Sequence, residues 1–348
     1  MNGLELLTGN TKRIEKNSPL LKYVSQLSMK TLYPEIQPYQ TFFLETGSKH
    51  SVYVEQSGNP DGIPVIFLHG GPCSGTKPDH RRFFNPECYR IILFDQRACG
   101  QSLPFGELDG NTTQDLIDDM ERIRRKLSIK QWLVFGGSWG GALGLLYAQQ
   151  HDACVSGLVI RAVFLARQQD LDWFAKDGAN RIYPEQWQRL VDSLPEDGRN
   201  DLLPSLCDVL WGEDEAARKR LTQAWMAWSA QVALGNTYQP VESGEPVTEK
   251  MVKQVRMELH YARHHYFIAE NQILVHCSLL QGIPTRIIHG RQDLLCPMEA
   301  GMKLHRALPN ANYVILPNAG HVAHHEEMID ALVSATDLFA EKHSFDTQ

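Results

Sequence analysis

A serine framed by glycines, in the run Gly136-Gly137-Ser138-Trp139-Gly140, is the feature that most restricts how this chain can fold. The run follows residues 132–135, an apolar stretch that predicts a strand, and precedes residues 142–150, which are rich in Ala, Leu and Gln and predict a helix. A serine on so sharp a turn needs small neighbours, because their Cβ atoms would collide with the adjoining strand and helix. The pattern predicts a nucleophile elbow with Ser138 at its tip. Taken alone, it also fits an ordinary glycine-rich turn.

Candidates for the groups that would activate Ser138 lie far downstream, each just beyond a short apolar strand. In α/β hydrolases that carry such an elbow, the acid and then the base follow the serine along the chain. Residues 285–290 predict a buried strand followed by Asp293, and residues 313–316 predict another followed by His321. We therefore predict a catalytic triad of Ser138, Asp293 and His321.

Each partner has an alternative. Asp293, taken alone, also fits a turn or a helix N-cap. His324 and His325 are rivals for the base, but they fall where the next helix is expected to begin, whereas His321 follows Gly320 on the loop after the strand.

Donors for a developing oxyanion are expected upstream. The apolar strand 64–68 runs into His69-Gly70-Gly71-Pro72, where the glycines allow backbone N–H groups to approach a substrate oxygen. The amides of Gly71 and Trp139 are the predicted oxyanion hole, the second being the amide that follows the nucleophile. For His69 we favour a structural hydrogen bond within its loop.

From these residues, the chain resembles the proline iminopeptidase (prolyl aminopeptidase) family of α/β-hydrolase serine peptidases. The resemblance covers nearly everything from residue 32 to about residue 340. Its motifs, in order, are His69-Gly70-Gly71-Pro72, Asp95-Gln96-Arg97 with Cys99-Gly100-Gln101-Ser102, Asn111-Thr112-Thr113, Gly136-Gly137-Ser138-Trp139-Gly140, Asp177-Gly178-Ala179, Pro184-Glu185-Gln186-Trp187, and His289-Gly290-Arg291-Gln292-Asp293 with Cys296-Pro297.

The resemblance implies a serine peptidase that removes an N-terminal residue, usually proline, from short peptides or amides through an acyl-enzyme. It implies no metal and no organic cofactor. It also carries the nucleophile, acid and base of the family onto Ser138, Asp293 and His321, in agreement with the spacing argument.

The family binds the positive nitrogen of its substrate with glutamates from a helical cap, and only one of the two is matched here. The segment 255–261 resembles the first family motif and carries that role onto Glu258, which on its own also fits a solvated helix charge. The second motif has Ser229 where a glutamate is expected. Because an ammonium group buried without a carboxylate is costly, the remaining glutamate keeps amine recognition plausible. Glu270 is a weaker substitute.

Other residues are expected near the pocket. Trp225 and Trp228, and the side chain of Trp139, are candidates for contact with substrate, although tryptophans between cap helices can serve packing alone. Cys73 and Ala98 stand where the family usually has glycine, and we expect their side chains to narrow or reshape the pocket.

Composition is that of an enzyme with a large core. The 348 residues are 43% hydrophobic, and the net charge of −7, without a basic run, argues against nucleic acid or an anionic membrane as a partner. No apolar stretch approaches the roughly 20 residues that cross a bilayer, and the N-terminus lacks the pattern of a signal peptide. Seven cysteines without framework spacing fit reduced thiols, so we expect a cytoplasmic protein. The histidines show no zinc spacing, which makes a metal site a weak interpretation.

The alternation of strands and helices predicts an α/β-hydrolase fold, with a mostly parallel central sheet covered by helices on both faces. Residues 31–164 and 281–348 are expected to form the catalytic domain, preceded by an extension over residues 1–30. Between residues 165 and 280 the strand pattern stops, and an inserted helical cap domain is expected there. The strands are predicted in a hairpin over residues 42–56 and over residues 65–68, 90–94, 132–135, 157–160, 286–289 and 313–316.

Two other functions remain open from the sequence. An esterase or amidase acting on small neutral acyl compounds would keep the mechanism and is favoured by Ser229. A non-catalytic binding protein is disfavoured because every catalytic group is present. The natural substrate, the oligomeric state and the purpose of residues 1–30 are left open.

Overall fold

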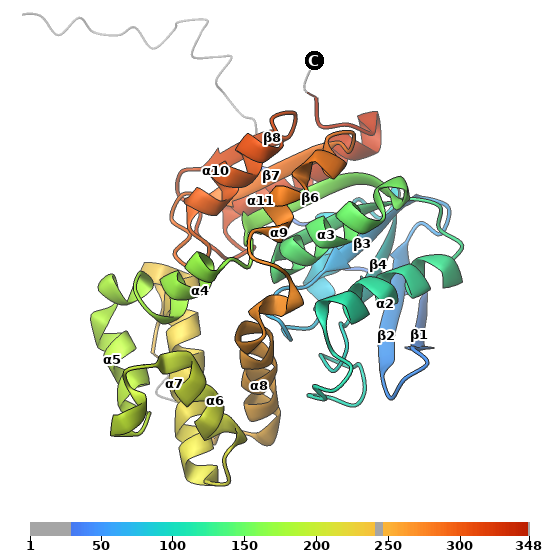
Figure 1. Ribbon diagram of the computed structural model, residues 1–348. Helices are drawn as coiled ribbons and strands as arrows, with labels where there is room; N and C mark the ends of the chain where they lie inside the picture. Colours follow the sequence, from blue (N-terminus) through green and yellow to red (C-terminus); the bar gives the residue numbers. More distant parts are fainter. Residues whose placement is uncertain (1–28, 241–245, 347–348) are drawn as a thin grey trace, which may run out of the picture.

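The computed structural model describes residues 29–240 and 246–346. Its centre is an eight-stranded sheet in the order β1-β2-β4-β3-β5-β6-β7-β8 (Figure 1). The strands are β1 (Gln40–Glu45), β2 (Ser51–Gly58), β3 (Ile63–Leu68), β4 (Tyr89–Phe94), β5 (Trp132–Ser138), β6 (Val155–Val163), β7 (Thr285–Gly290) and β8 (Asn312–Leu316). The β1–β2 hairpin and the β2–β4 pair are antiparallel, and all other neighbours are parallel. The predicted edge hairpin and the mostly parallel sheet are confirmed.

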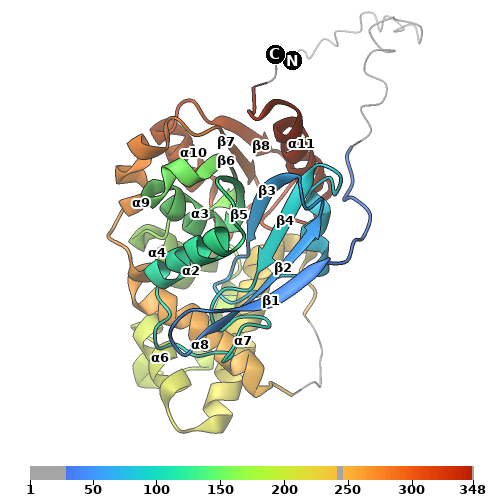
Figure 2. The ribbon, with the colours of Figure 1, turned by 90° about the vertical axis from the view of Figure 1, so that its right-hand side faces the viewer.

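Helices cover both faces of the sheet, as predicted. Helices α2 (Thr113–Lys126), α3 (Trp139–Gln150) and α10 (Met298–Ala307) share one apolar core with the strands. Helix α11 (Glu326–Lys342) packs into a second core on the opposite face (Figure 2). Because both faces are covered, the central strands read as continuous apolar runs.

Local sequence explains where α2 begins and how it packs. The hydroxyl of Thr112 accepts a hydrogen bond from Asp115 N at 3.3 Å, and the carboxylate of Asp115 accepts one from Thr112 N at 3.0 Å. Leu116, Met120 and Ile123 recur at three- and four-residue spacing along α2 and are fully buried, so this face of the helix packs into the core.

The segment between β6 and β7 contains helices and no strand among its described residues. The helices are α4 (Gln168–Ala175), α5 (Pro184–Asp192), α6 (Leu202–Trp211), α7 (Glu215–Leu234), α8 (Glu249–Arg263) and α9 (Gln272–Val275). In Figure 1, α5 to α8 form one group beside the sheet, and their apolar side chains form a separate core that includes Leu206, Trp228 and Leu259. The division of the chain into a catalytic domain and a cap domain stays a prediction.

Short 3₁₀ turns connect these elements. They are η1 (Pro78–Phe83), η2 (Asp152–Cys154), η3 (Ala179–Arg181), η4 (Glu196–Gly198), η5 (Gly235–Thr237), η6 (His265–Phe267) and η7 (Cys277–Leu280).

The proposed N-terminal extension lies outside the described residues except at its end. There the backbone N–H of Lys30 donates to Asp330 Oδ1 at 2.7 Å, and its ammonium group lies 2.6 Å from Asp337 Oδ2. These contacts attach residue 30 to α11. Over residues 29–240 and 246–346, the helices are too short or too polar to cross a membrane.

Candidate active site

Ser138 lies at the end of β5, immediately before α3, in a backbone conformation with φ of 55° and ψ of −128°. The neighbouring glycines are required by space. A Cβ on Gly136 would lie 2.4 Å from Gly140 O, and a Cβ on Gly140 would lie 2.1 Å from Leu68 O on β3. The predicted elbow geometry is confirmed, with one glycine facing the helix and the other facing the neighbouring strand.

Asp293 and His321 meet at the same edge of the sheet, on the loops that follow β7 and β8. His321 Nδ1 lies 2.9 Å from Asp293 Oδ2, and both side chains are buried. The amides of Leu295 and Cys296 donate to Asp293 Oδ1 at 3.0 and 2.8 Å. Burial alone would raise the pKa of Asp293, but the imidazole of His321, with smaller effects of His289 and the amide of Cys296, outweighs burial and holds that pKa below its ordinary value.

Ser138 lines the same pocket as His321, but its hydroxyl faces a third group. Ser138 Oγ lies 3.9 Å from Cys296 Sγ. Within the described part of the chain no hydrogen bond joins Ser138 to His321. Serine–base contacts are often loose in ligand-free sites and shorten when substrate binds, and rotation about the Cα–Cβ bond of Ser138 redirects its hydroxyl.

The glycine-rich loop after β3 lies beside the nucleophile. A Cβ on Gly70 would lie 3.6 Å from Ser138 Cβ, and Gly71 lines the pocket. Gln96 connects this loop to the elbow, because its side-chain N–H donates to His69 O at 2.8 Å and its Oε1 accepts from Trp139 Nε1 at 3.0 Å. The ring of His69 is buried, with Nε2 accepting from the amide of Gln96, so it has the structural role expected for it.

Asp95 holds the other side of the same loop. Its Oδ1 accepts hydrogen bonds from the amide and hydroxyl of Thr76 at 2.6 and 2.8 Å, and its Oδ2 accepts one from Gln101 N at 2.7 Å. A buried carboxylate with three donors is well satisfied and needs no counter-ion. The motif that begins at Asp95 therefore supports the loop that contains Gly71.

The pocket above Ser138 has a volume of about 630 Å³. Helices α7 and α8 contribute Trp225, Ser229 and Glu258 to its wall, and the strand β6 contributes Arg161. The pocket thus places three of the predicted substrate-binding side chains in one cavity with Ser138 and His321.

Glu258 has no cationic partner in the described chain. Its Oε2 accepts a hydrogen bond from Trp225 Nε1 at 2.8 Å, and its Oε1 lies 3.5 Å from Gln254 Nε2. Burial raises the pKa of Glu258 from 4.5 to about 7, while the hydrogen bonds from Trp225 and Gln254 act in the opposite direction. A carboxyl group of this kind gains a favourable partner if a cation enters the pocket.

Comparison with known proteins agrees with this geometry. Residues 63–328 match the model of the alpha/beta hydrolase fold family. A proline iminopeptidase of Xanthomonas citri is 42% identical over 313 residues, covering 90% of this chain and all of that protein, and one of Arabidopsis thaliana is 41% identical over 314 residues, covering 89% and 82%. The chain belongs to the proline iminopeptidase family of α/β hydrolases.

Solved structures agree on the fold at lower identity. A proline iminopeptidase of Mycobacterium smegmatis is 18% identical, with a TM-score of 0.54, and covers 87% of this chain and 98% of its own. A chain from a crystal-structure study of carboxylesterases of Nitrososphaera gargenis is also 18% identical, with a TM-score of 0.58. The match covers 86% of this chain and 99% of that chain. Together they support the α/β-hydrolase architecture.

Cys73 and Ala98, the two residues that stand where the family resemblance leads us to expect glycine, do not line the pocket. Cys73 and Ala98 have positive φ angles of 79° and 58°, the conformation that glycine adopts at least cost. Both side chains are buried, and Cys73 Sγ lies 3.8 Å from Ala98 O. The expectation that they narrow the pocket is wrong, because both point into the core beneath the loop.

Three predicted contacts with substrate are not brought to the pocket. Trp228 is buried and donates through Nε1 to Phe174 O at 3.1 Å, so it packs between helices. The indole of Trp139 is buried against Tyr261 and bonds Gln96, which leaves only its backbone amide as a site group. Glu270 is exposed, and its Oε2 accepts from Gln168 N at 2.9 Å.

Arg161 is one of the ionisable pocket residues that sequence reasoning missed, together with Lys77, His80 and Asp170. The available signal was an arginine inside an otherwise apolar parallel strand, where a charge needs a reason. Its Nη1 donates to His321 O at 2.9 Å.

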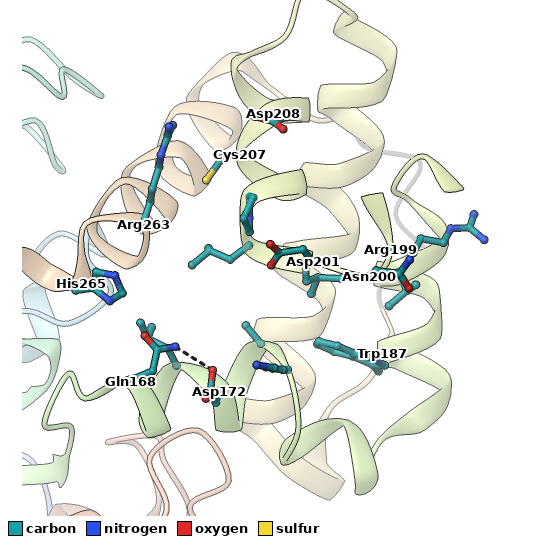
Figure 3. A pocket seen from close by; sticks show the side chains of 17 residues that line it. Gln168, Asp172, Trp187, Arg199, Asn200, Asp201, Cys207, Asp208, Arg263 and His265 are labelled. Atoms are coloured by element: carbon teal, nitrogen blue, oxygen red, sulfur yellow. Dashed lines mark hydrogen bonds between the residues drawn. The ribbon is translucent and has the colours of Figure 1, made fainter. Parts of the chain in front are cut away.

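A second cavity, of about 870 Å³, lies among the helices between β6 and β7 (Figure 3). Gln168, Asp172, Asp201 and Arg263 line it, and Leu171, Ala175 and Leu203 line both cavities. The second cavity is therefore adjacent to the pocket of Ser138 along these apolar side chains, and none of the predicted site residues lines it.

Proposed function

We propose that this chain is a serine aminopeptidase that releases an N-terminal residue, with proline preferred, from short peptides or amides. The observation that carries the proposal is the position of Glu258, a carboxyl group without a cationic partner in the pocket that contains Ser138. An N-terminal amine would supply the missing positive charge. The names of the relatives support proline as the preferred residue.

In the proposed mechanism, Ser138 Oγ turns from Cys296 toward His321 and attacks the scissile carbonyl carbon. His321 accepts the hydroxyl proton and then donates it to the leaving amine, while Asp293 orients the ring and stabilises its protonated form. The amides of Gly71 and Trp139 donate to the oxyanion. Water then hydrolyses the acyl-enzyme by the same proton transfers in reverse, releasing the N-terminal residue.

Substrate selection is proposed to follow from the walls of the pocket. The amine faces Glu258, which the indole of Trp225 holds in place, and the apolar ring of the N-terminal residue lies among side chains such as Phe164 and Phe174. Ser229 leaves Glu258 as the principal acidic group for the amine.

A panel of prolyl, alanyl and N-acetylprolyl arylamides tests the proposal. We expect hydrolysis of the free-amine substrates, prolyl fastest, and little hydrolysis of the acetylated one. Equal rates on free and acetylated substrates would exclude an aminopeptidase and favour an esterase or amidase. Labelling by a fluorophosphonate, lost in Ser138→Ala, tests the nucleophile independently of substrate.

We also propose that the protein acts in the cytoplasm. All seven cysteines are free thiols, which fits a reducing compartment.

A further inference from the structure

We propose that the active-site pocket also contains an anion subsite, built on Arg161 and Lys77, that binds the C-terminal carboxylate of the shortest peptides. The favoured substrates would then be dipeptides with both ends free. This inference rests on the proposed aminopeptidase function, since it assigns the part of the same site that binds the residue after the scissile bond.

Arg161 lies against the nucleophile turn. It pairs with Gly137 in the β5–β6 register, and a Cβ added to Gly137 would lie 2.5 Å from both Cγ and Nε of Arg161. The guanidinium therefore extends across the residue that precedes Ser138. The small size of Gly137 makes room for it.

The guanidinium of Arg161 has no close counter-ion among the described residues, although the carboxylate of Asp293 acts on it from further away. Its one hydrogen bond among the described residues is to the backbone carbonyl of His321, and no described carboxylate forms an ion pair with it. Burial lowers the pKa of Arg161, partly offset by Asp293, yet an arginine keeps its proton in proteins. A guanidinium has five N–H donors in a planar fork that fits a carboxylate, so donors remain for a ligand.

Further basic groups lie on the same side of the pocket. Lys77, His80 and His324 line it together with Arg161, and Lys77 is exposed at its edge without an ion pair in the described chain. After burial, the groups that lower the pKa of His80, to about 3, are His69, Arg161, Lys77 and His324. Arg161 and Lys77 both carry a positive charge at neutral pH, so these two residues place two cations at the pocket wall.

Two acidic side chains, those of Glu258 and Asp170, also line the pocket. Glu258 and Asp170 both act on Tyr266, whose pKa they raise after the larger effect of burial and that of Cys296. Asp170 is already paired with Arg167 at 2.7 Å, which leaves Glu258 as the unpaired acid. The pocket therefore holds one carboxyl group, Glu258, and one guanidinium, Arg161, that have no ion-pair partner among the described residues.

A zwitterionic dipeptide matches this arrangement. The amine of its first residue would face Glu258, and the carboxylate of its second residue lies only about one residue, roughly 3.5 Å, beyond the scissile carbonyl. Because Arg161 lies beside the turn that holds Ser138, a carboxylate at that distance is within reach of the guanidinium. A peptide amide lacks this charge and would leave Arg161 without a ligand.

Matched pairs of substrates test the inference. Prolylglycine and prolylglycinamide differ only in the terminal charge, and prolylglycylglycine moves that charge one residue further away. We expect kcat/KM for prolylglycine to exceed that for the amide at least tenfold, mainly through KM, with the tripeptide between them. Added salt should reduce the ratio because Lys77 is exposed.

Substitutions then assign the subsite to its residues. Arg161→Met should bring the acid-to-amide ratio of kcat/KM close to one, and Arg161→Lys should keep part of it. Because Arg161 also bonds His321 O, the rates on both substrates are expected to fall in these variants, so the ratio is the measured quantity. If they do not fold, Lys77→Met should lower the ratio severalfold. Lys130→Met removes an equally exposed charge away from the pocket and should leave the ratio unchanged.

The outcomes separate this inference from the proposed function. If neither dipeptide nor a prolyl arylamide is hydrolysed, the aminopeptidase proposal fails. If the acid and the amide are hydrolysed equally well by the wild type, or if the ratio survives in Arg161→Met, the anion subsite is wrong and the aminopeptidase proposal stands.

Discussion

The indole N–H of Trp225 donates a 2.8 Å hydrogen bond to Oε2 of Glu258, and this bond joins α7 to α8 at the wall of the active-site pocket. The bond favours the ionised carboxylate, which opposes the effect of burial on the pKa of Glu258. It also fixes which way the carboxylate faces. Amine recognition should therefore depend on an indole that need not touch the substrate.

Replacing the indole donor of Trp225 should shift the pH dependence of kcat/KM to higher pH. In Trp225→Phe the pKa of Glu258 should rise above its value of about 7, since a bond to the charged form is lost. The acidic limb of the kcat/KM profile for prolyl arylamide would then shift to higher pH. Trp228→Phe removes an indole that bonds Phe174 O instead, and an equal shift in that variant would contradict the role given to Trp225.

Glu258→Gln should weaken binding and stabilise the fold. The folded-state pKa of about 7 exceeds the ordinary value of 4.5, so the folded protein holds this proton more tightly than the unfolded chain. The wild type therefore loses stability as pH rises from about 4.5 to about 7, by up to about 3 kcal/mol. The variant avoids that loss.

Urea unfolding at pH 5, 6, 7 and 8 measures this difference, which should grow with pH and level off above about 7. The same variant should show a raised KM for prolyl arylamide. Glu270→Gln, an exposed carboxylate outside the pocket, is the control. A stability difference independent of pH would show that burial does not perturb Glu258.

Asp293→Asn should reduce kcat by about 10⁴ with little change in KM, because the amide no longer holds the ring of His321 in the tautomer that can accept the serine proton. Single-turnover and steady-state rates on prolyl arylamide measure the effect. Circular dichroism should show an intact fold. A loss below tenfold with an intact fold would mean that another residue orients the base.

Ala98→Gly should leave stability nearly unchanged despite the loss of a buried methyl group. Ala98 has a positive φ of 58°, where an L-residue is disfavoured by roughly 1–2 kcal/mol, and glycine relieves that cost. Removing the methyl group loses about 0.8 kcal/mol of burial. Ala148→Gly, within α3, loses a methyl group and adds a helix penalty of about 1 kcal/mol. The midpoint temperature of thermal unfolding should therefore fall clearly in Ala148→Gly and not in Ala98→Gly. Equal losses in both would argue against strain at residue 98.

Elements with a strong local signal were predicted well from sequence. The β-strands are short apolar runs bounded by turns, and the glycines around Ser138 are a local signal of the tight turn that joins a strand to a helix. Asp293 and His321 could be placed because parallel strands end at one edge of the sheet.

Side-chain direction was predicted less well, because it depends on neighbours that are distant in sequence. Trp225 and Trp228 are three residues apart on α7, yet one lines the pocket and the other packs against Phe174. Cys73 and Ala98 were expected at the pocket because of where their loops lie, but their side chains turn into the core. For Arg161, only the position of β6 next to β5 reveals that it lies beside Ser138.

The sheet and the helices between β6 and β7 contribute different parts of the candidate site. Ser138, Asp293 and His321 lie at strand ends and on loops of the sheet, whereas Trp225, Ser229 and Glu258 lie on α7 and α8. We therefore expect mutations in α7 and α8 to change which amines are accepted while Ser138, Asp293 and His321 keep their supports. Exchanging these helices between relatives offers a modular route to new selectivities.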